Sequence, residues 1–194
     1  MSKFKIAVVV GSTRRDSLNR KLAESLARLG AGKLEFSFVR IDDLPLYNQD
    51  LEAELPQSVL RFKTEVEAAD GVLVVTPEHN RSLPAALKNA IDWGGRPYGQ
   101  NSWAGKVVAI AGASPGAIGA ALAQQHLRQV LGGFLGALVM PGEAYIAFRP
   151  GLIDDAGAIA DEGTRGFLQG FVDQFASLLA RLARSGERPK EAAA

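Results

Sequence analysis

Short runs of apolar residues alternate along this chain with longer segments in which apolar residues recur every three or four positions. Residues 4–10, 72–75 and 107–111 are largely apolar and rich in β-branched side chains, which is typical of strands buried on both faces of a parallel sheet. Residues 34–40 alternate apolar and polar side chains and predict an edge strand. A last short strand is expected at 138–140.

The segments between these runs have helical periodicity. We predict helices at 17–30, 59–69, 85–93, 120–131 and 163–184. The last helix should bury one face, formed by Phe167, Phe171, Phe175, Leu178 and Leu182.

Strands and helices therefore alternate along the whole chain, which predicts an α/β fold. We expect a flavodoxin-like, doubly wound, five-stranded parallel sheet in the order 2-1-3-4-5, with helices on both faces. The 194 residues fit one domain over 1–184, followed by a polar tail at 185–194 that we expect to be disordered.

Composition narrows the possible functions. Hydrophobic residues make up 47% of the chain, and the net charge of +1 gives no reason to expect nucleic acid or a membrane surface as partner. The absence of cysteine excludes disulfides and thiolate chemistry, and two histidines argue against a His-rich metal site. The apolar run at 6–10 is too short for a signal peptide, so we expect a cytoplasmic protein without a metal.

The loop between the first strand and the first helix is rich in glycine, hydroxyls and arginine. A helix N-terminus presents free N–H groups, so this loop suits a phosphate. Ser12, Ser17 and Asn19 could add donors, and Arg14 or Arg15 could add charge. The loop matches neither a Walker A motif nor a dinucleotide-binding turn. The alternative is that Ser17 only caps the helix and the arginines are only solvated.

A second polar loop, 76–82, follows the apolar run 72–75. Ser82 is a candidate N-cap for the next helix, with Pro84 in its first turn. In the predicted strand order this loop meets the first loop and a small-residue loop at 112–119. The three loops together predict a nucleotide-sized cleft, although each alone could be an ordinary connection.

Four motifs carry a resemblance to a known family. They are GSTRRDSLN at 11–19, TPEHNRSLPAALKNAIDW at 76–93, AGK at 104–106 and the small-residue loop at 112–119. With these motifs the chain resembles the NADPH-dependent FMN reductases, a flavodoxin-like group that includes quinone, chromate and azo-dye reductases. The resemblance extends over most of residues 4–180 and implies FMN as the bound cofactor.

The resemblance also implies site residues. For the FMN phosphate these are Ser12, Arg14, Ser17, Leu18 and Asn19. For the isoalloxazine ring they are Pro77, Glu78, His79 and Asn80, with Ser82 nearby, and the third loop contributes Ser114 and Gly116. The family often has tyrosine where this chain has His79, which could line the flavin or be merely structural.

The implied activity passes a hydride from NADPH, with NADH as the alternative donor, to FMN and then electrons to small-molecule acceptors such as quinones, free flavin, azo compounds or chromate. We expect ping-pong kinetics and no dedicated catalytic residue, so Asp92 and Arg96 should be solvated or lie at an interface. Similar proteins are homodimers or homotetramers. Trp93, Tyr98 and Trp103 are therefore expected to cover the flavin or to pack against a second subunit.

Two other functions remain open at this point. A flavodoxin-type electron carrier would lack NAD(P)H oxidase activity of its own. Such carriers are typically strongly acidic, whereas this chain is close to neutral. A redox-silent binding protein would keep the fold but hold no flavin. NADPH oxidation in the presence of a quinone separates the reductase from the carrier, and a colourless protein that cannot be reconstituted with FMN would indicate the redox-silent protein.

Overall fold

The structure of this chain, a computed structural model, describes residues 3–154 and 156–185. Its strands are β1 Phe4–Val10, β2 Leu34–Val39, β3 Gly71–Thr76, β4 Val107–Ser114, β5 Leu138–Val139 and β6 Ala144–Ala147. Its helices are α1 Leu18–Gly30, η1 Gln49–Ala53, α2 Gln57–Glu67, α3 Ala85–Gly95, α4 Ala121–Arg128, η2 Gln129–Phe134 and α5 Glu162–Ser185. Of the tail expected at 185–194, all but Ser185 lies outside the described residues.

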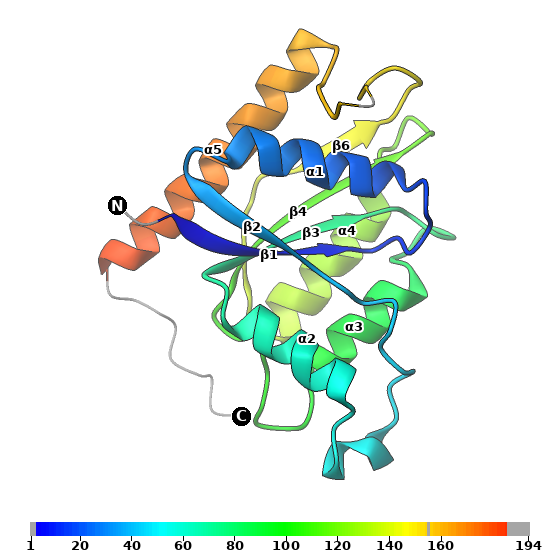
Figure 1. The fold of residues 1–194 in the computed structure, drawn as a ribbon, viewed down its shortest axis with the longest axis vertical. Coiled ribbons are helices and arrows are strands. Elements are labelled where there is room, and N and C mark those ends of the chain that lie inside the picture. The colour runs from blue at the N-terminus through cyan, green and yellow to red at the C-terminus, as the bar shows by residue number, and fades with distance from the viewer. Residues whose placement is uncertain (1–2, 155, 186–194) are drawn as a thin grey trace.

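The strands pair in parallel in the order β2-β1-β3-β4-β5 (Figure 1). β1 pairs with β2 on one side and with β3 on the other. The predicted flavodoxin-like order is therefore confirmed. The order reverses between β1 and β3, and in such sheets ligands bind outside the carboxyl ends of the strands at this point.

Two short strands, rather than one, lie beside β4 at the far edge of the sheet. β5 pairs with the first residues of β4, from Val107, and β6 pairs with its last residues, up to Ser114. Pro141 and Gly142 lie between β5 and β6. Proline has no N–H for a strand ladder and so interrupts the pairing. The described residues therefore form a sheet of six strands, of which the sequence predicted β5 and missed β6.

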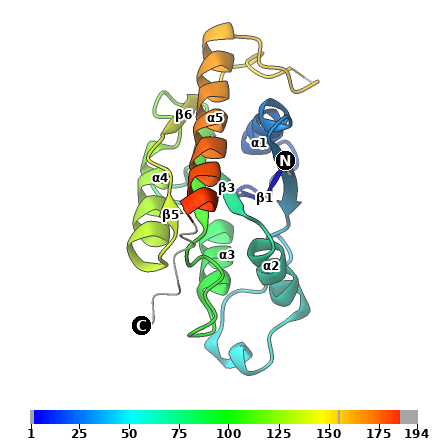
Figure 2. The ribbon, with the colours of Figure 1, turned by 90° about the vertical axis from the view of Figure 1, so that its left-hand side faces the viewer.

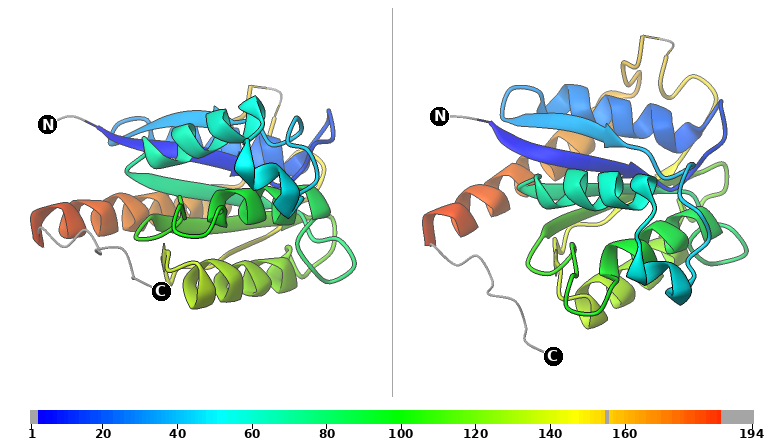
Figure 3. Two further views of the ribbon diagram at one scale, coloured as in Figure 1. Left: turned by 90° about the horizontal axis from the view of Figure 1, so that it is seen from below. Right: turned by 60° about the horizontal axis from the view of Figure 1, so that its bottom comes forward.

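The sheet separates two hydrophobic cores, as the prediction of helices on both faces requires. Val8 of β1 points into the core shared with α1 and α5, and Val9 points into the core shared with α2, α3 and α4. Figure 1 shows α1 and α5 on one side of the strands and α2 and α3 on the other. In Figure 3, α2 and α3 lie side by side and cover the second face.

Helix α5 buries a face rotated from the predicted one. Phe171 and Phe175 are buried as expected, but the side chain of Phe167 is 51% exposed, and Leu168 is buried in its place. Figure 2 shows the first turns of α5 at one end of the molecule, where the sheet no longer covers them. Although α5 spans 24 residues, no helix in the described part of the chain is long and apolar enough to cross a membrane.

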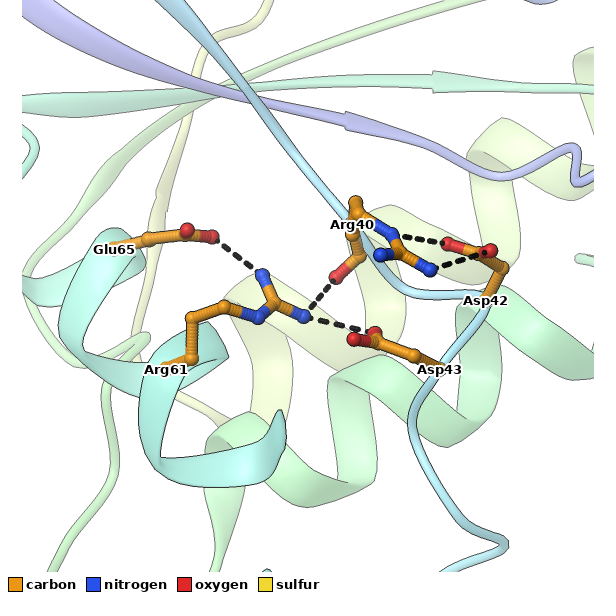
Figure 4. A network of polar contacts seen from close by, with 5 residues as sticks. All are labelled: Arg40, Asp42, Asp43, Arg61 and Glu65. Atoms are coloured by element: carbon orange, nitrogen blue, oxygen red, sulfur yellow. Dashed lines mark hydrogen bonds and ion pairs between the residues drawn. The ribbon is translucent and has the colours of Figure 1, made fainter. Parts of the chain in front are cut away.

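A network of charged groups fastens the segment after β2 to α2 (Figure 4). The Arg61 guanidinium donates to Asp43 at 2.8 Å, to the Arg40 carbonyl at 3.1 Å and to Glu65 at 2.8 Å. Arg40 in turn donates two hydrogen bonds to Asp42, each 3.1 Å long, and these bonds lower the pKa of the Asp42 carboxyl. The irregular segment 40–48 is thereby held against the helix that precedes β3.

Both tryptophans lie in the core, which corrects the expectation that they cover the flavin or a subunit contact. The side chains of Trp93 and Trp103 are fully buried. The indole of Trp103 donates to the Ile91 carbonyl at 3.0 Å, and that of Trp93 donates to the Pro45 carbonyl at 2.8 Å. Of the three aromatic residues, only Tyr98 is exposed. The loop after α3 is thus ordered by core packing.

Candidate functional site

The three loops selected from the sequence meet at the carboxyl edge of the sheet. We call them the β1 loop (residues 11–17), the β3 loop (77–84) and the β4 loop (115–120). The backbone N–H of Gly11 donates to the Val75 carbonyl at 2.8 Å, so the β1 loop begins hydrogen-bonded to β3. Because Thr76 pairs with Gly112, the β3 and β4 loops leave the sheet beside each other.

Two glycines allow this close approach of strands and loops. A Cβ atom added to Gly11 would lie 2.9 Å from Leu87 Cδ2 and 3.0 Å from Thr76 Oγ1. One added to Gly112 would lie 2.5 Å from the Thr76 carbonyl oxygen. Real Cβ atoms do not come so close to backbone atoms, so a side chain at Gly112 would push β4 away from the end of β3.

A cavity of about 550 Å³ lies between the loops. It is lined by residues of the β1 loop and the start of α1, of the β3 loop, of the first turn of α3, and of the end of β4. Sites for small molecules and cofactors typically have volumes of about 300–1,000 Å³. The cleft predicted from the strand order is therefore present and large enough for a nucleotide.

Most of the predicted site residues line this cavity. These are Ser12, Arg14, Ser17, Leu18, Asn19, Pro77, Glu78, His79 and Ser114. The other three, Asn80, Ser82 and Gly116, do not line it. Sequence reasoning missed Pro84, Ala85 and Ala86, whose small side chains open the first turn of α3 to the cavity. Their position inside the motif at 76–93 was the available signal.

Free backbone donors lie in the β1 loop, which leads into α1. The N–H groups of Ser12, Thr13 and Arg14 donate to no other group in the described part of the chain. Ser17 caps the helix, because its Oγ accepts from the Arg20 N–H at 3.1 Å and its side chain is buried. The end of a helix dipole and unpaired N–H groups together favour an anion such as phosphate. The exposed Arg14 adds a positive charge nearby.

The amide of Asn19 joins the start of α1 to the end of β4. Its Nδ2 donates to the Ala113 carbonyl at 2.9 Å, and its Oδ1 accepts from the Ala113 N–H at 2.9 Å. The side chain is buried. Both polar atoms of Asn19 are thus engaged by backbone, and its contribution to the cavity is to hold two loops at a fixed separation.

The β3 loop contains a tight turn with an unusual backbone. The N–H groups of His79 and Ser82 each donate to the other residue's carbonyl at 2.9 Å. Between them, Asn80 and Arg81 have φ angles of 49° and 65°. Asparagine tolerates this left-handed region, whereas arginine adopts it at a cost of about 1–2 kcal/mol. Strained backbone of this kind is concentrated at functional sites.

Ser82 does not cap α3, which corrects that prediction. The helix begins at Ala85, and Pro84 occupies its N-cap position without a side-chain cap. The hydroxyl of Ser82 lies instead 2.9 Å from Nδ1 of His126 on α4. Ser82 thus lies two residues before the N-cap position, and its backbone is held in the tight turn.

A larger cavity of about 1110 Å³ adjoins the first one, and Ala85 lines both. It lies between α3 and the segment formed by α4 and η2, and its apolar lining includes Leu83, Val130 and Phe134. Phe134 is 87% exposed. The smaller cavity is therefore bordered, at Ala85, by the open apolar surface of the larger one.

Asp92 and Arg96 also line the larger cavity. Asp92 pairs with Lys88 at 2.6 Å, one helical turn away. Arg96 pairs with Glu52 at 2.7 Å, and the Tyr47 hydroxyl donates to the same carboxylate at 2.6 Å. The hydrogen bond from Tyr47 and that from Arg96 lower the pKa of Glu52. Asp92 and Arg96 are thus each engaged in an ion pair beside an apolar surface.

Comparison with known proteins identifies the family to which these features belong. A sequence model of the family described as NADPH-dependent FMN reductase matches residues 4–150. A quinone reductase of Pseudomonas putida is 52% identical over 177 residues, covering 90% of this chain and 94% of that protein. A 2-hydroxy-1,4-benzoquinone reductase of a Burkholderia species is 50% identical over 174 residues, covering 90% and 95%.

Solved structures agree with the sequence matches. FerB of Paracoccus denitrificans, described as a flavoenzyme NAD(P)H:(acceptor) oxidoreductase, superposes with a TM-score of 0.88. It is 51% identical in sequence, and the alignment covers 92% of this chain and 98% of FerB. Fold and sequence therefore lead to the same group of proteins.

Proposed function

The chain belongs to the NADPH-dependent FMN reductase family, and from this premise we propose that it is an FMN-dependent NAD(P)H:quinone reductase. Membership of the family confirms the resemblance, the enzyme class and the cofactors expected from the sequence, FMN and a reduced nicotinamide. Quinones are the acceptors we propose, because relatives at 50% and 52% identity are described as quinone reductases.

The observation that carries the proposal is the cavity of about 550 Å³ bordered by unpaired N–H groups of the β1 loop. We propose that these N–H groups and Arg14 hold the FMN phosphate, and that Pro77, His79 and Ser114 border the ring. When bound, FMN would supply the chemistry of hydride and electron transfer between the nicotinamide and the acceptor. The protein residues bind and orient the cofactor, and backbone N–H groups stabilise negative charge.

The experiment begins with the absorption spectrum of the purified protein, with FMN added where needed. We expect flavin bands that bleach within seconds when NADPH is added without oxygen, and that return when a benzoquinone is added. Steady-state rates should give parallel double-reciprocal lines, as a ping-pong mechanism requires. Titration with NADH in the same assay measures the preference between the two nicotinamides.

Three results would lead to other conclusions. Flavin that dithionite bleaches but neither nicotinamide does would favour the electron carrier. Rapid bleaching by NADPH, followed by oxidation with chromate or an azo dye but not with quinones, would change the proposed acceptor. A protein that binds no FMN at all would contradict the reductase and leave a redox-silent binding protein.

We further propose that a second copy of the chain covers the larger cavity between α3 and η2. The exposed Phe134 and the apolar lining of this cavity support the proposal, because exposed apolar surface of this kind marks subunit contacts. The shared residue Ala85 would place the subunit boundary beside the cofactor cleft. A cytoplasmic homodimer or homotetramer thus remains our prediction for the assembly.

A further inference from the structure

The β3 loop is fastened to α4 on both sides of its tight turn. Before the turn, Oε2 of Glu78 accepts from the backbone N–H groups of Leu122 at 3.0 Å and Ala123 at 3.4 Å. At the end of the turn, the hydroxyl of Ser82 lies 2.9 Å from Nδ1 of His126. His126 is one helical turn beyond Leu122, so the loop lies along the first turns of α4.

The N-terminus of α4 has no cap within its own segment. Ala120 occupies the N-cap position with a left-handed backbone, φ 64°, and its side chain has no acceptor. The carboxylate of Glu78 supplies the missing acceptor from a position 44 residues earlier in the chain. A negative charge is favoured there, because the free N–H groups and the helix dipole make the N-terminus positive.

The other carboxylate oxygen is also engaged. Oε1 of Glu78 accepts from the Arg81 guanidinium at 3.2 Å, and the Glu78 side chain is only 10% exposed. Arg81 is one of the two residues of the tight turn that are held in the left-handed region. Glu78 thus connects the strained turn to α4, and its carboxylate is directed at these groups.

We infer that Glu78 is a positioning residue that caps α4 and holds the β3 loop in the shape required at the cofactor cleft. The carboxylate is not a ligand of the flavin ring. The inference rests on the proposed function only in assigning FMN to the cleft, since the cap itself is independent of any cofactor. The capping role also explains why the β3 loop carries an acidic residue at position 78.

A direct electrostatic role of Glu78 toward the flavin is the competing explanation. Glu78→Gln separates the two, because glutamine keeps an acceptor oxygen at the same distance from the backbone but carries no charge. A cap needs the acceptor, so Gln should largely replace Glu and Ala should not. A charge acting on the flavin is lost equally in both variants, and each would then shift the reduction potential to the same extent.

The experiment compares wild type, Glu78→Gln and Glu78→Ala, with Glu65→Gln as the control for loss of a carboxylate paired to arginine on a helix away from the cleft. In the apoprotein, amide hydrogen exchange at Leu122 and Ala123 should be at least about tenfold faster in Glu78→Ala and within about threefold of wild type in the other two variants. The FMN dissociation constant, from fluorescence quenching, should rise about tenfold in Glu78→Ala and less than about threefold in Glu78→Gln. The flavin midpoint potential should be nearly unchanged in Glu78→Gln.

Two results would overturn the inference. One is unchanged exchange at Leu122 and Ala123 in a folded Glu78→Ala variant. The other is an equal shift of the midpoint potential in Glu78→Gln and Glu78→Ala. Failure of the wild-type protein to bind FMN would contradict the proposed function alone, because the exchange measurement uses the apoprotein.

Discussion

At the scale of single residues, the sequence identified the polar side chains of the site better than it identified what they do. Ser17, Asn19 and Ser82 were selected as donors for a ligand or as a helix cap. The structure engages Ser17 with the Arg20 N–H and Asn19 with the Ala113 backbone. Ala113 is 94 residues from Asn19, and a backbone partner has no motif of its own. Residue type and spacing therefore could not reveal the contact of Asn19, whereas the capping role of Ser17 was one of the two interpretations that the sequence offered.

The turn in the β3 loop was hidden for a related reason. Asn80 and Arg81 adopt positive φ angles without glycine, the residue that normally signals such a turn. Once formed, the turn moves Ser82 away from α3 and toward His126. The wrong assignment of Ser82 as a cap follows from this missing signal.

Lys63 gives a prediction at the same scale. Its ammonium is buried, and it donates to the carbonyls of Gly94 at 3.3 Å and Gln100 at 2.5 Å and to Ser102 Oγ at 2.9 Å. Burial lowers the pKa of Lys63, and the nearby Glu67 partly opposes this shift. Lys63→Met should lower the free energy of unfolding by about 2 kcal/mol, because buried acceptors lose a charged donor.

Urea unfolding followed by circular dichroism measures this change. Lys33→Met is the matched control, since Lys33 pairs with Asp173 on the surface and its side chain is 62% exposed. An exposed pair contributes about 0–1 kcal/mol, so the control should remain near wild type. Equal losses of unfolding free energy in Lys63→Met and Lys33→Met would show that the burial of Lys63 does not determine its contribution to stability.

At the scale of elements, the long buried strands were predicted well, whereas of the two short strands β5 was predicted and β6 was missed. The continuous apolar runs of β1, β3 and β4 have the composition of central strands, and the structure confirms them. β6 has only four residues, and its pattern differs little from that of a loop. In α5 periodicity located the helix, but tertiary packing decides which face is buried, and it left Phe167 exposed.

The start of α5 offers a prediction with a defined pH dependence. Oδ1 of Asp161 accepts from the Thr164 N–H at 2.6 Å, as an N-cap does. Hydrogen bonds from the Thr164 side chain and backbone lower the pKa of Asp161 from 3.8. A carboxyl with a lowered pKa stabilises the fold fully above the unfolded-state value, and this contribution is lost as the pH falls through the folded-state value.

Asp161→Ala should therefore reduce the melting temperature at pH 7, and the difference from wild type should shrink below about pH 4. Asp161→Asn keeps a capping oxygen without the titrating group. Its melting temperature at pH 7 should therefore lie above that of Asp161→Ala and nearer to that of wild type. Differential scanning calorimetry at pH 7 and pH 3 measures both variants. A difference between wild type and Asp161→Ala that is independent of pH would exclude the carboxylate as its source.

At the scale of the whole molecule, the strand order could be predicted because the connection rules leave few alternatives. Alternating strands and helices with right-handed crossovers place the loops after β1, β3 and β4 at one edge. This placement brought nine of the twelve predicted site residues to one cavity. The larger cavity could not be predicted, because it depends on how α3 packs relative to α4 and η2, and no periodic pattern encodes that packing.

Phe134 gives the prediction for the assembly. If a second copy covers the larger cavity, Phe134→Asp places a charge in an apolar contact, and the subunits should separate. Light scattering coupled to gel filtration should give a multiple of the 20.6 kDa chain for wild type and a single chain for Phe134→Asp. Phe167→Asp, an exposed phenylalanine on α5, should keep the wild-type mass. A monomeric wild type would contradict the predicted assembly. An oligomeric wild type whose mass is unchanged in Phe134→Asp would place the contact between copies elsewhere.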